Sequence, residues 1–152
     1  MASNIHHPIQ YKYVNIENVN MFYREAGEKS LPTLLLLHGF PSSSHQFREL
    51  IPLLADKFHL IAPDFPGFGF TEVIDTANYI YSFDNISKTL IKFVDALSLK
   101  KYAMYVFDYG APIGFRLALA YPERVNRICI PKWQCLFGRF RQCLESNKDL
   151  LG

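Results

Sequence analysis

An aspartate separates a β-branched and aromatic stretch from a run of small residues in the segment YVFDYGAPIGFRLALAYPERV, residues 105–125. Val106, Asp108 and Gly110 have the spacing of a nucleophile elbow, a strained turn that holds its central side chain clear of a sheet. A carboxylate in that position can attack an electrophilic carbon and form an ester. An aspartate before a helix is more often a capping residue, so the surrounding elements must decide between these two roles.

Two other loops carry residue types that suit a binding site. The segment HGFP, residues 38–41, follows the apolar run TLLLL, and the segment DFPGFG, residues 64–69, follows LIAP. Loops at the carboxyl ends of parallel strands meet at one edge of a sheet, where ligands bind. The three loops are therefore predicted to form one site. A dinucleotide site is the alternative, but GFG lacks the third glycine and the helix start of that fingerprint.

The elements that must position these loops alternate along the chain. Residues 11–25 predict a β-hairpin, and apolar runs predict strands within residues 33–40, 59–65, 101–107 and 125–130. Helical spacing predicts helices over residues 43–58, 82–99 and 111–125, with Pro52 the one discordant residue. Because parallel neighbours need crossover helices, this order predicts an α/β fold with a doubly wound, mostly parallel sheet.

Length and composition indicate one globular domain. The chain has 152 residues, of which 49% are apolar, and its formal net charge of +2 is too small to indicate nucleic-acid binding. The longest aliphatic run, Leu34 to Leu37, is far shorter than the ~20 apolar residues that span a bilayer. The first ten residues lack the apolar segment of a signal peptide. We therefore expect a soluble, cytoplasmic protein without a membrane or nucleic-acid partner.

In their order and spacing, the segments LLLLHGFPSSSHQFR, LIAPDFPGFGFTE and YVFDYGAPIGFRLALAYPERV resemble the α/β-hydrolase fold. Within that fold they resemble the branch with an aspartate nucleophile, which contains epoxide hydrolases and haloalkane or haloacid-type dehalogenases. The resemblance covers residues 10 to about 128. It implies that the full-length relatives act on a small-molecule substrate without a metal or other cofactor.

The resemblance also implies roles for individual residues. Asp108 would attack an electrophilic carbon, and a water activated by a histidine would hydrolyse the resulting alkyl ester. The backbone N–H groups of Phe40 and Tyr109 would hold the oxyanion. The supporting residues of the loop and the elbow would be His38, Gly39, Pro41 and Gly110.

Two features favour the epoxide hydrolases over the dehalogenases. Dehalogenases of this kind generally have a tryptophan after the nucleophile, whose N–H holds the halide, whereas this chain has Tyr109. The segment HGFP is also more similar to the epoxide hydrolases. In that family the proton donors to the opened epoxide are tyrosines of a cap domain inserted after the sixth strand. Tyr79 and Tyr81 precede the elbow, so we assign them to packing.

The expected catalytic histidine has no counterpart after the elbow in this sequence. The order of the triad along the chain is nucleophile, acid, histidine. All five histidines precede Asp108, at positions 6, 7, 38, 45 and 59, and the later carboxylates Glu123, Glu145 and Asp149 lie in no family-like setting. We therefore expect a truncated core over residues 1–128, with about the first six strands and without the cap and last strands. Asp108 would be alkylated once at most, without turnover.

Residues 129–152 differ from the rest of the chain. The net charge is −2 through Glu123 and +4 from Arg124 onward, and all three cysteines, Cys129, Cys135 and Cys143, lie in this tail. Their odd number, without a nearby histidine, indicates neither a zinc site nor a disulfide. One choice of codons for residues 130–152, read one base later, gives FQNGNAYLEGLGNAWNPIKTYW, which is similar to the family's continuation into the cap. We hypothesise a frameshift between about residues 125 and 130 and expect a poorly ordered tail.

Other functions remain open at this point. The basic and aromatic tail residues Trp133, Phe137, Arg139, Phe140 and Arg141 are also compatible with an interaction or membrane-surface module. The fragment could instead be a natural regulatory or dimerising piece, or derive from a dehalogenase. Loss of the last strands would leave residues 125–130 as an unpaired sheet edge, which favours self-association.

Overall fold

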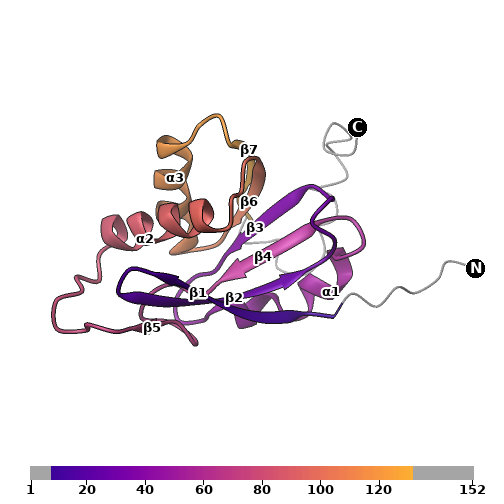
Figure 1. Cartoon of the computed structure of the whole chain (residues 1–152). Helices are drawn as coiled ribbons and strands as arrows, with labels where there is room; N and C mark the ends of the chain where they lie inside the picture. The colour runs from indigo at the N-terminus through magenta and orange to yellow at the C-terminus, as the bar shows by residue number, and fades with distance from the viewer. Residues whose placement is uncertain (1–7, 132–152) are drawn as a thin grey trace, which may run out of the picture.

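The computed structural model describes residues 8–131 of the chain, and the calls made above for the tail beyond Pro131 lie outside this range. The described residues form one mixed sheet with helices on both faces (Figure 1). Its strands are β1 (Gln10–Ile16), β2 (Val19–Ala26), β3 (Thr33–Leu37), β4 (His59–Pro63), β5 (Glu72–Val73), β6 (Tyr102–Val106) and β7 (Val125–Cys129). The expectation of an α/β fold with a mostly parallel, doubly wound sheet is confirmed.

The strand order places three parallel strands at the centre of the sheet. The order is β1-β2-β4-β3-β6-β7, in which β4, β3, β6 and β7 are parallel to one another. The hairpin of β1 and β2 runs antiparallel to β4, and the two-residue strand β5, which the sequence did not predict, pairs with β2. The predicted hairpin is confirmed, and its turn is tight because Glu17 adopts a left-handed backbone conformation with φ of 55°.

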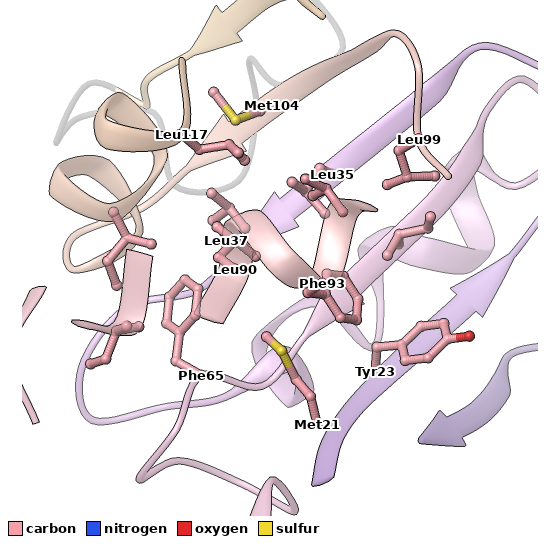
Figure 2. Packing of buried hydrophobic residues seen from close by; sticks show 14 of the residues in the cluster. Met21, Tyr23, Leu35, Leu37, Phe65, Leu90, Phe93, Leu99, Met104 and Leu117 are labelled. Carbon is pink, nitrogen blue, oxygen red and sulfur yellow. The ribbon is translucent and has the colours of Figure 1, made fainter. Parts of the chain in front are cut away.

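The buried leucines of β3 serve both faces of the sheet. Leu35 and Leu37 pack with the helices α2 (Phe83–Ala96) and α3 (Gly110–Ala120), in the cluster that Figure 2 shows with Phe65, Phe93 and Met104. Leu34 and Leu36 pack on the opposite face. That face is covered by the 3₁₀ helix η1 (Ser44–Phe47) and the short helix α1 (Leu50–Leu54). The unbroken apolar run of β3 is thus explained by burial on both sides.

The prediction of one helix over residues 43–58 is wrong. The chain forms η1 and α1 with a break at Arg48 and Glu49. Pro52 has no N–H to donate, so it fits the first turn of a helix and not the interior of a longer one. Ser43 caps η1, since its side chain accepts a hydrogen bond from the backbone N–H of His45.

Strand β7 is the edge of the sheet in the part of the chain that the structure describes. It pairs with β6 on one side, and the described residues provide no strand on the other. Self-association through this edge stays a prediction. Among residues 8–131, no helix is long and apolar enough to cross a membrane.

Candidate active site

Asp108 lies on a strained turn between β6 and α3. Its φ of +50° places a residue with a side chain in the left-handed region, which such residues rarely adopt. The backbone N–H groups of Gly110 and Ala111 donate to the carbonyl oxygens of Phe107 and Asp108, at 2.8 and 2.9 Å, and so tighten the turn. The turn leaves the Asp108 side chain exposed. Asp108 is therefore not the N-terminal cap of α3, whose first flanking residue is Tyr109.

Two glycines allow the loops to approach this turn. A Cβ atom on Gly110 would lie 2.4 Å from the carbonyl oxygen of Leu37, at the end of β3. A Cβ atom on Gly39 would lie 2.5 Å from the Cβ atom of Asp108 and 2.9 Å from its Oδ1 atom. All three distances are shorter than the contacts that a Cβ atom can make. Glycine is therefore required at both positions, where the loops after β3 and β6 meet.

One oxygen of Asp108 is held by a backbone amide. The N–H of Phe40 donates to Oδ1 of Asp108 at 2.8 Å, across 68 positions of sequence. Among the described residues, Oδ2 accepts no hydrogen bond, so one carboxylate oxygen is held in place and the other is available to react. The oxyanion role expected for the Phe40 N–H stays a prediction. The role expected for the N–H of Tyr109 stays a prediction.

His38 joins the first two loops and is not a base. Its Nε2 atom accepts a hydrogen bond from the N–H of Phe65 at 3.0 Å, so its Nδ1 atom carries the proton and donates to the carbonyl oxygen of Gly39 at 3.1 Å. The ring is fully buried, and this burial lowers the pKa of His38 below its usual value. His38 therefore stays neutral and fixes the position of the loop that carries Phe40.

Asp64 organises the loop after β4, a role that the sequence analysis missed. Its carboxylate is fully buried and accepts hydrogen bonds from the N–H groups of Ser44, at 2.7 Å, and Phe70, at 2.9 Å. A Cβ atom on Gly69 would lie 1.9 Å from Oδ2 of Asp64. An aspartate followed by a Pro-Gly turn was the available signal, since carboxylates in such loops commonly accept backbone N–H groups.

Four aromatic side chains contact one another around Tyr109, the residue after Asp108, and we call them the aromatic collar: Phe40, Phe68, Phe83 and Tyr109. The Tyr109 ring lies at the centre, with centroid distances of 5.7 Å to Phe40, 6.2 Å to Phe68 and 4.9 Å to Phe83. Phe40 is 60% exposed and Tyr109 37% exposed. The collar thus presents an apolar surface beside a carboxylate. Phe68 belongs to the predicted loop of residues 64–69, whereas Phe83 was not expected in the site.

Four further residues, Gln46, Pro41, Tyr79 and Tyr81, complete the description of the site and its surroundings. Gln46 accepts a hydrogen bond from the N–H of Gly39 at 3.3 Å, a contact that the sequence did not indicate. Pro41 follows Phe40 through a cis peptide bond. The hydroxyl group of Tyr79 lies 3.1 Å from that of Thr89 on α2, in accordance with its assigned packing role. Tyr81 packs against the Tyr79 ring, at a centroid distance of 4.9 Å.

No set of three histidine, cysteine, aspartate or glutamate side chains within residues 8–131 is arranged to hold a metal ion. The two described histidines besides His38, which are His45 and His59, form no hydrogen bond with Asp108. His45 is exposed, and His59 lies at the start of β4.

Comparisons with known proteins agree with this arrangement. The family model described as alpha/beta hydrolase fold matches residues 32–130. A hydrolase of Saccharomyces cerevisiae, described as uncharacterised, is 57% identical over 112 residues, which are 74% of this chain and 38% of the yeast protein. The chain therefore spans about two fifths of the length of this relative.

Solved structures give the same result. Haloalkane dehalogenase DbeA from Bradyrhizobium elkani superposes with a TM-score of 0.76 at 30% identity, over 81% of this chain and 41% of the dehalogenase. The epoxide hydrolase CorEH superposes with a TM-score of 0.72 at 30% identity, over 81% of this chain and 42% of that enzyme. One of these proteins is a haloalkane dehalogenase and the other an epoxide hydrolase, which are the two branches that the sequence resembles.

Proposed function

Because this chain belongs to the alpha/beta hydrolase fold family, we propose that Asp108 is the nucleophile of an epoxide-hydrolase-like site. The observation that carries this proposal is the hydrogen bond from the Phe40 N–H to Oδ1 of Asp108 on a left-handed turn. The carboxylate lies on a strained backbone turn at the carboxyl edge of a parallel sheet, and a backbone amide holds one of its oxygens. This arrangement suits attack on a substrate and not helix capping. Dehalogenase and epoxide hydrolase relatives support the same class of chemistry.

The proposed step forms one ester bond. Oδ2 of Asp108 attacks a ring carbon of the epoxide, the bond from that carbon to the ring oxygen breaks, and the alkoxide takes a proton from water or a donor group. The product is a hydroxyalkyl ester of Asp108, in which Oδ1 has become the carbonyl oxygen. The Phe40 N–H already bonds this atom, so it would stabilise the negative charge that develops there when water attacks the ester.

The 152-residue chain should stop at this ester. Hydrolysis requires a base that activates water, and the family places its histidine after the nucleophile. In the sequence given, no histidine follows Asp108, and the buried ring of His38 is occupied by Gly39 and Phe65. We therefore propose single alkylation without turnover for the chain as given.

Intact-protein mass spectrometry after exposure to styrene oxide tests both parts of the proposal. We expect one adduct per chain, mapped by peptide sequencing to Asp108, and no diol production beyond one equivalent. Asp108→Asn should abolish the adduct, because a neutral amide is a poor nucleophile. Asp56→Asn is the matched control, since Asp56 is an exposed aspartate away from the elbow and its loss should leave labelling unchanged.

Two results would contradict the proposal in different ways. Labelling that survives Asp108→Asn would exclude Asp108 as the nucleophile. Diol formation over many turnovers that depends on Asp108 would confirm the nucleophile and exclude the proposed stop at the ester.

A dehalogenase parent is the second candidate, because haloalkane dehalogenases are among the relatives of this chain. In that reaction Oδ2 displaces a halide and the same ester linkage forms. Labelling by styrene oxide and by 1-chlorohexane at equal concentration separates the candidates, and we expect the epoxide to react faster. Tyr109→Trp would place an indole N–H near the leaving group, so it should raise labelling by the chloroalkane if the dehalogenase reading holds.

We also propose that the tail from residue 129 arises from a frameshift between about residues 125 and 130. This inference is supported by the change in net charge and by the family-like peptide that one choice of codons gives when it is read one base later. Sequencing the coding DNA across codons 120–150 tests it. A transcript in which no single-base slip restores a long open frame would overturn it.

A further inference from the structure

We propose that a second cavity, at the amino ends of β3, β4 and β6, binds a small phosphate monoester with an apolar body. The cavity has a volume of about 530 Å³ and is lined by the starts of these strands and by the loop after α2. Thr33 at its wall is the first residue of β3, whereas Phe40 follows the other end of that strand. At ~3.3 Å per residue, the two ends of β3 are about 13 Å apart, so the cavity is separate from Asp108.

Positive charge converges on this cavity. Lys29, Lys100 and Lys101 line it, and no aspartate or glutamate does. None of the three lysines forms an ion pair or hydrogen bond with the described residues, whereas Lys12 and Lys92 are paired with carboxylates. Three unpaired ammonium groups around one concave surface favour an anion of more than one charge, and lysine is a common ligand of phosphate.

The nearest carboxylates on the same segments are engaged elsewhere. Glu28 precedes Lys29, and its carboxylate accepts a hydrogen bond from the hydroxyl group of Ser30. Glu25 lies behind the wall of the cavity, where its carboxylate bonds both His59 and Lys12. Glu25 is therefore neutralised by its own partners, whereas Glu28 keeps its negative charge next to Lys29, and Lys100 and Lys101 supply the positive charge that neither carboxylate offsets.

Neutral donors add to the lysines. The side chains of Ser98 and Asn126 line the cavity, and neither has a hydrogen-bond partner within residues 8–131. Elsewhere on the lining, Nδ1 of His59 lies 3.3 Å from the Thr33 hydroxyl group and Nε2 lies 2.7 Å from Oε1 of Glu25, so these two side chains are held in place. Ser98 and Asn126 are exposed, so a bound phosphate would replace water at their donor groups.

The rest of the lining is apolar. Leu31, Phe58, Leu97 and Leu99 contribute hydrocarbon surface beside the lysines. Inorganic phosphate would leave this surface exposed to water, whereas an aryl phosphate would cover it. The volume of the cavity lies within the range of sites for small organic ligands.

Titration of the 152-residue protein with 1-naphthyl phosphate tests the proposal, followed by calorimetry and by backbone amide NMR shifts. We expect tighter binding than for inorganic phosphate, which lacks the apolar body, and for 1-naphthol, which lacks the charge. The shifts should cluster at Thr33, Ser98, Lys100 and Asn126 and spare Asp108. The double variant Lys100→Gln/Lys101→Gln should raise Kd by about tenfold, since each exposed charge contributes roughly 0.5 to 1 kcal/mol.

The matched control removes the same charge from elsewhere. Lys57 and Lys88 are also exposed lysines without a partner among the described residues, and neither lines the cavity. The variant Lys57→Gln/Lys88→Gln should keep the original Kd. Equal weakening by both double variants, equal affinity for 1-naphthyl phosphate and inorganic phosphate, or shifts centred on Asp108 would overturn the proposal. The outcome does not depend on whether Asp108 is a nucleophile.

Discussion

The two ends of β3, β4 and β6 differ in how their side chains are used. At the carboxyl ends, side chains bond the backbone of neighbouring loops, as His38 bonds Phe65 and as Asp108 accepts from Phe40. At the amino ends, one buried group of side chains bonds itself, with Glu25 between Lys12 and His59, and the lysines outside it have no partners. The difference indicates that the carboxyl edge is built to fix backbone positions, whereas the amino edge leaves donors unfilled.

Removing one member of the buried group should produce the largest loss of stability. His59→Leu leaves Glu25, whose side chain is 8% exposed, with Lys12 as its remaining partner. A buried carboxylate that loses a partner costs about 3 kcal/mol, so we expect the free energy of unfolding in urea to fall by that amount. The double variant Glu25→Met/His59→Leu should recover much of the loss, because no buried charge remains. A near-neutral His59→Leu would show that the group contributes little to stability.

A substitution at the carboxyl edge should act on reactivity. Gly39→Ala would place a Cβ atom 2.5 Å from the Cβ atom of Asp108, so the carboxylate must move away from the Phe40 N–H. Misplacement of a reacting group by about 1 Å can cost about a hundredfold in rate, and we expect labelling of Asp108 by styrene oxide to slow by that factor.

The matching change at the amino edge should have no effect on labelling. Lys100→Gln/Lys101→Gln should be alkylated at the original rate, because these lysines lie at the other ends of the strands. Slower labelling in that variant would show that the two edges are coupled, and unchanged labelling in Gly39→Ala would show that the close approach of the loop is not needed.

The two edges should also lose stability in different pH ranges. Burial lowers the pKa of His38 below its usual value of 6.5, so the folded state resists protonation more than the unfolded state does. The stability contributed by neutral His38 is present above about pH 6.5 and is lost as the pH falls below it, by up to about 1.4 kcal/mol for each unit of difference in pKa. Asp64, which lies near the ring, opposes this shift but does not reverse it.

The amino edge should respond at lower pH. Burial alone would raise the pKa of Glu25, but hydrogen bonds from Lys12 and His59 outweigh it and leave the pKa below 4.5. The stability that ionised Glu25 contributes is therefore present above about pH 4.5 and is lost on further acidification. Urea unfolding between pH 8 and pH 3.5 should show two ranges of falling stability. His38→Gln should remove the upper range and Glu25→Gln the lower one, and a single range in the original protein would contradict the assignment.

The sequence predicts a feature of either edge well only when the residues that form this feature lie close together in the chain. The turn at Asp108 was predictable because Val106, Asp108 and Gly110 lie within one short segment, between a strand and a helix of clear periodicity. The family resemblance implied an oxyanion role for the Phe40 N–H but did not give its hydrogen bond to Asp108. Gln46 and Asp64 were missed because each accepts a hydrogen bond from a backbone group in another part of the loops.

No short segment of the sequence indicated the cavity at the amino edge. Its cavity combines residues 29–33, 58–59, 97–103 and 126, which come together only once the strand order is known. The break between η1 and α1 was missed for a related reason. Apolar spacing over residues 43–58 favoured one helix, whereas Ser44 gives its backbone N–H to Asp64, and Pro52 has none to give.

The smallest expected effect concerns a hydroxyl group at the amino edge. Tyr102, the first residue of β6, is 1% exposed, and its hydroxyl group has no hydrogen-bond partner among the described residues. Burial raises the pKa of Tyr102 to about 12, as expected for a phenol whose charged form is poorly solvated. Tyr102→Phe removes an unsatisfied polar atom and should raise the free energy of unfolding by up to about 1 kcal/mol.

Tyr79→Phe is the opposite case, since it removes a hydroxyl group that lies 3.1 Å from that of Thr89, and it should lower the free energy of unfolding by about 1 kcal/mol. Urea unfolding of the two variants side by side therefore compares a buried hydroxyl group without a partner to one with a partner. If Tyr102→Phe were the more destabilising change, the Tyr102 hydroxyl group would have to be satisfied by water or a ligand, and the amino edge would be as fully bonded as the carboxyl edge.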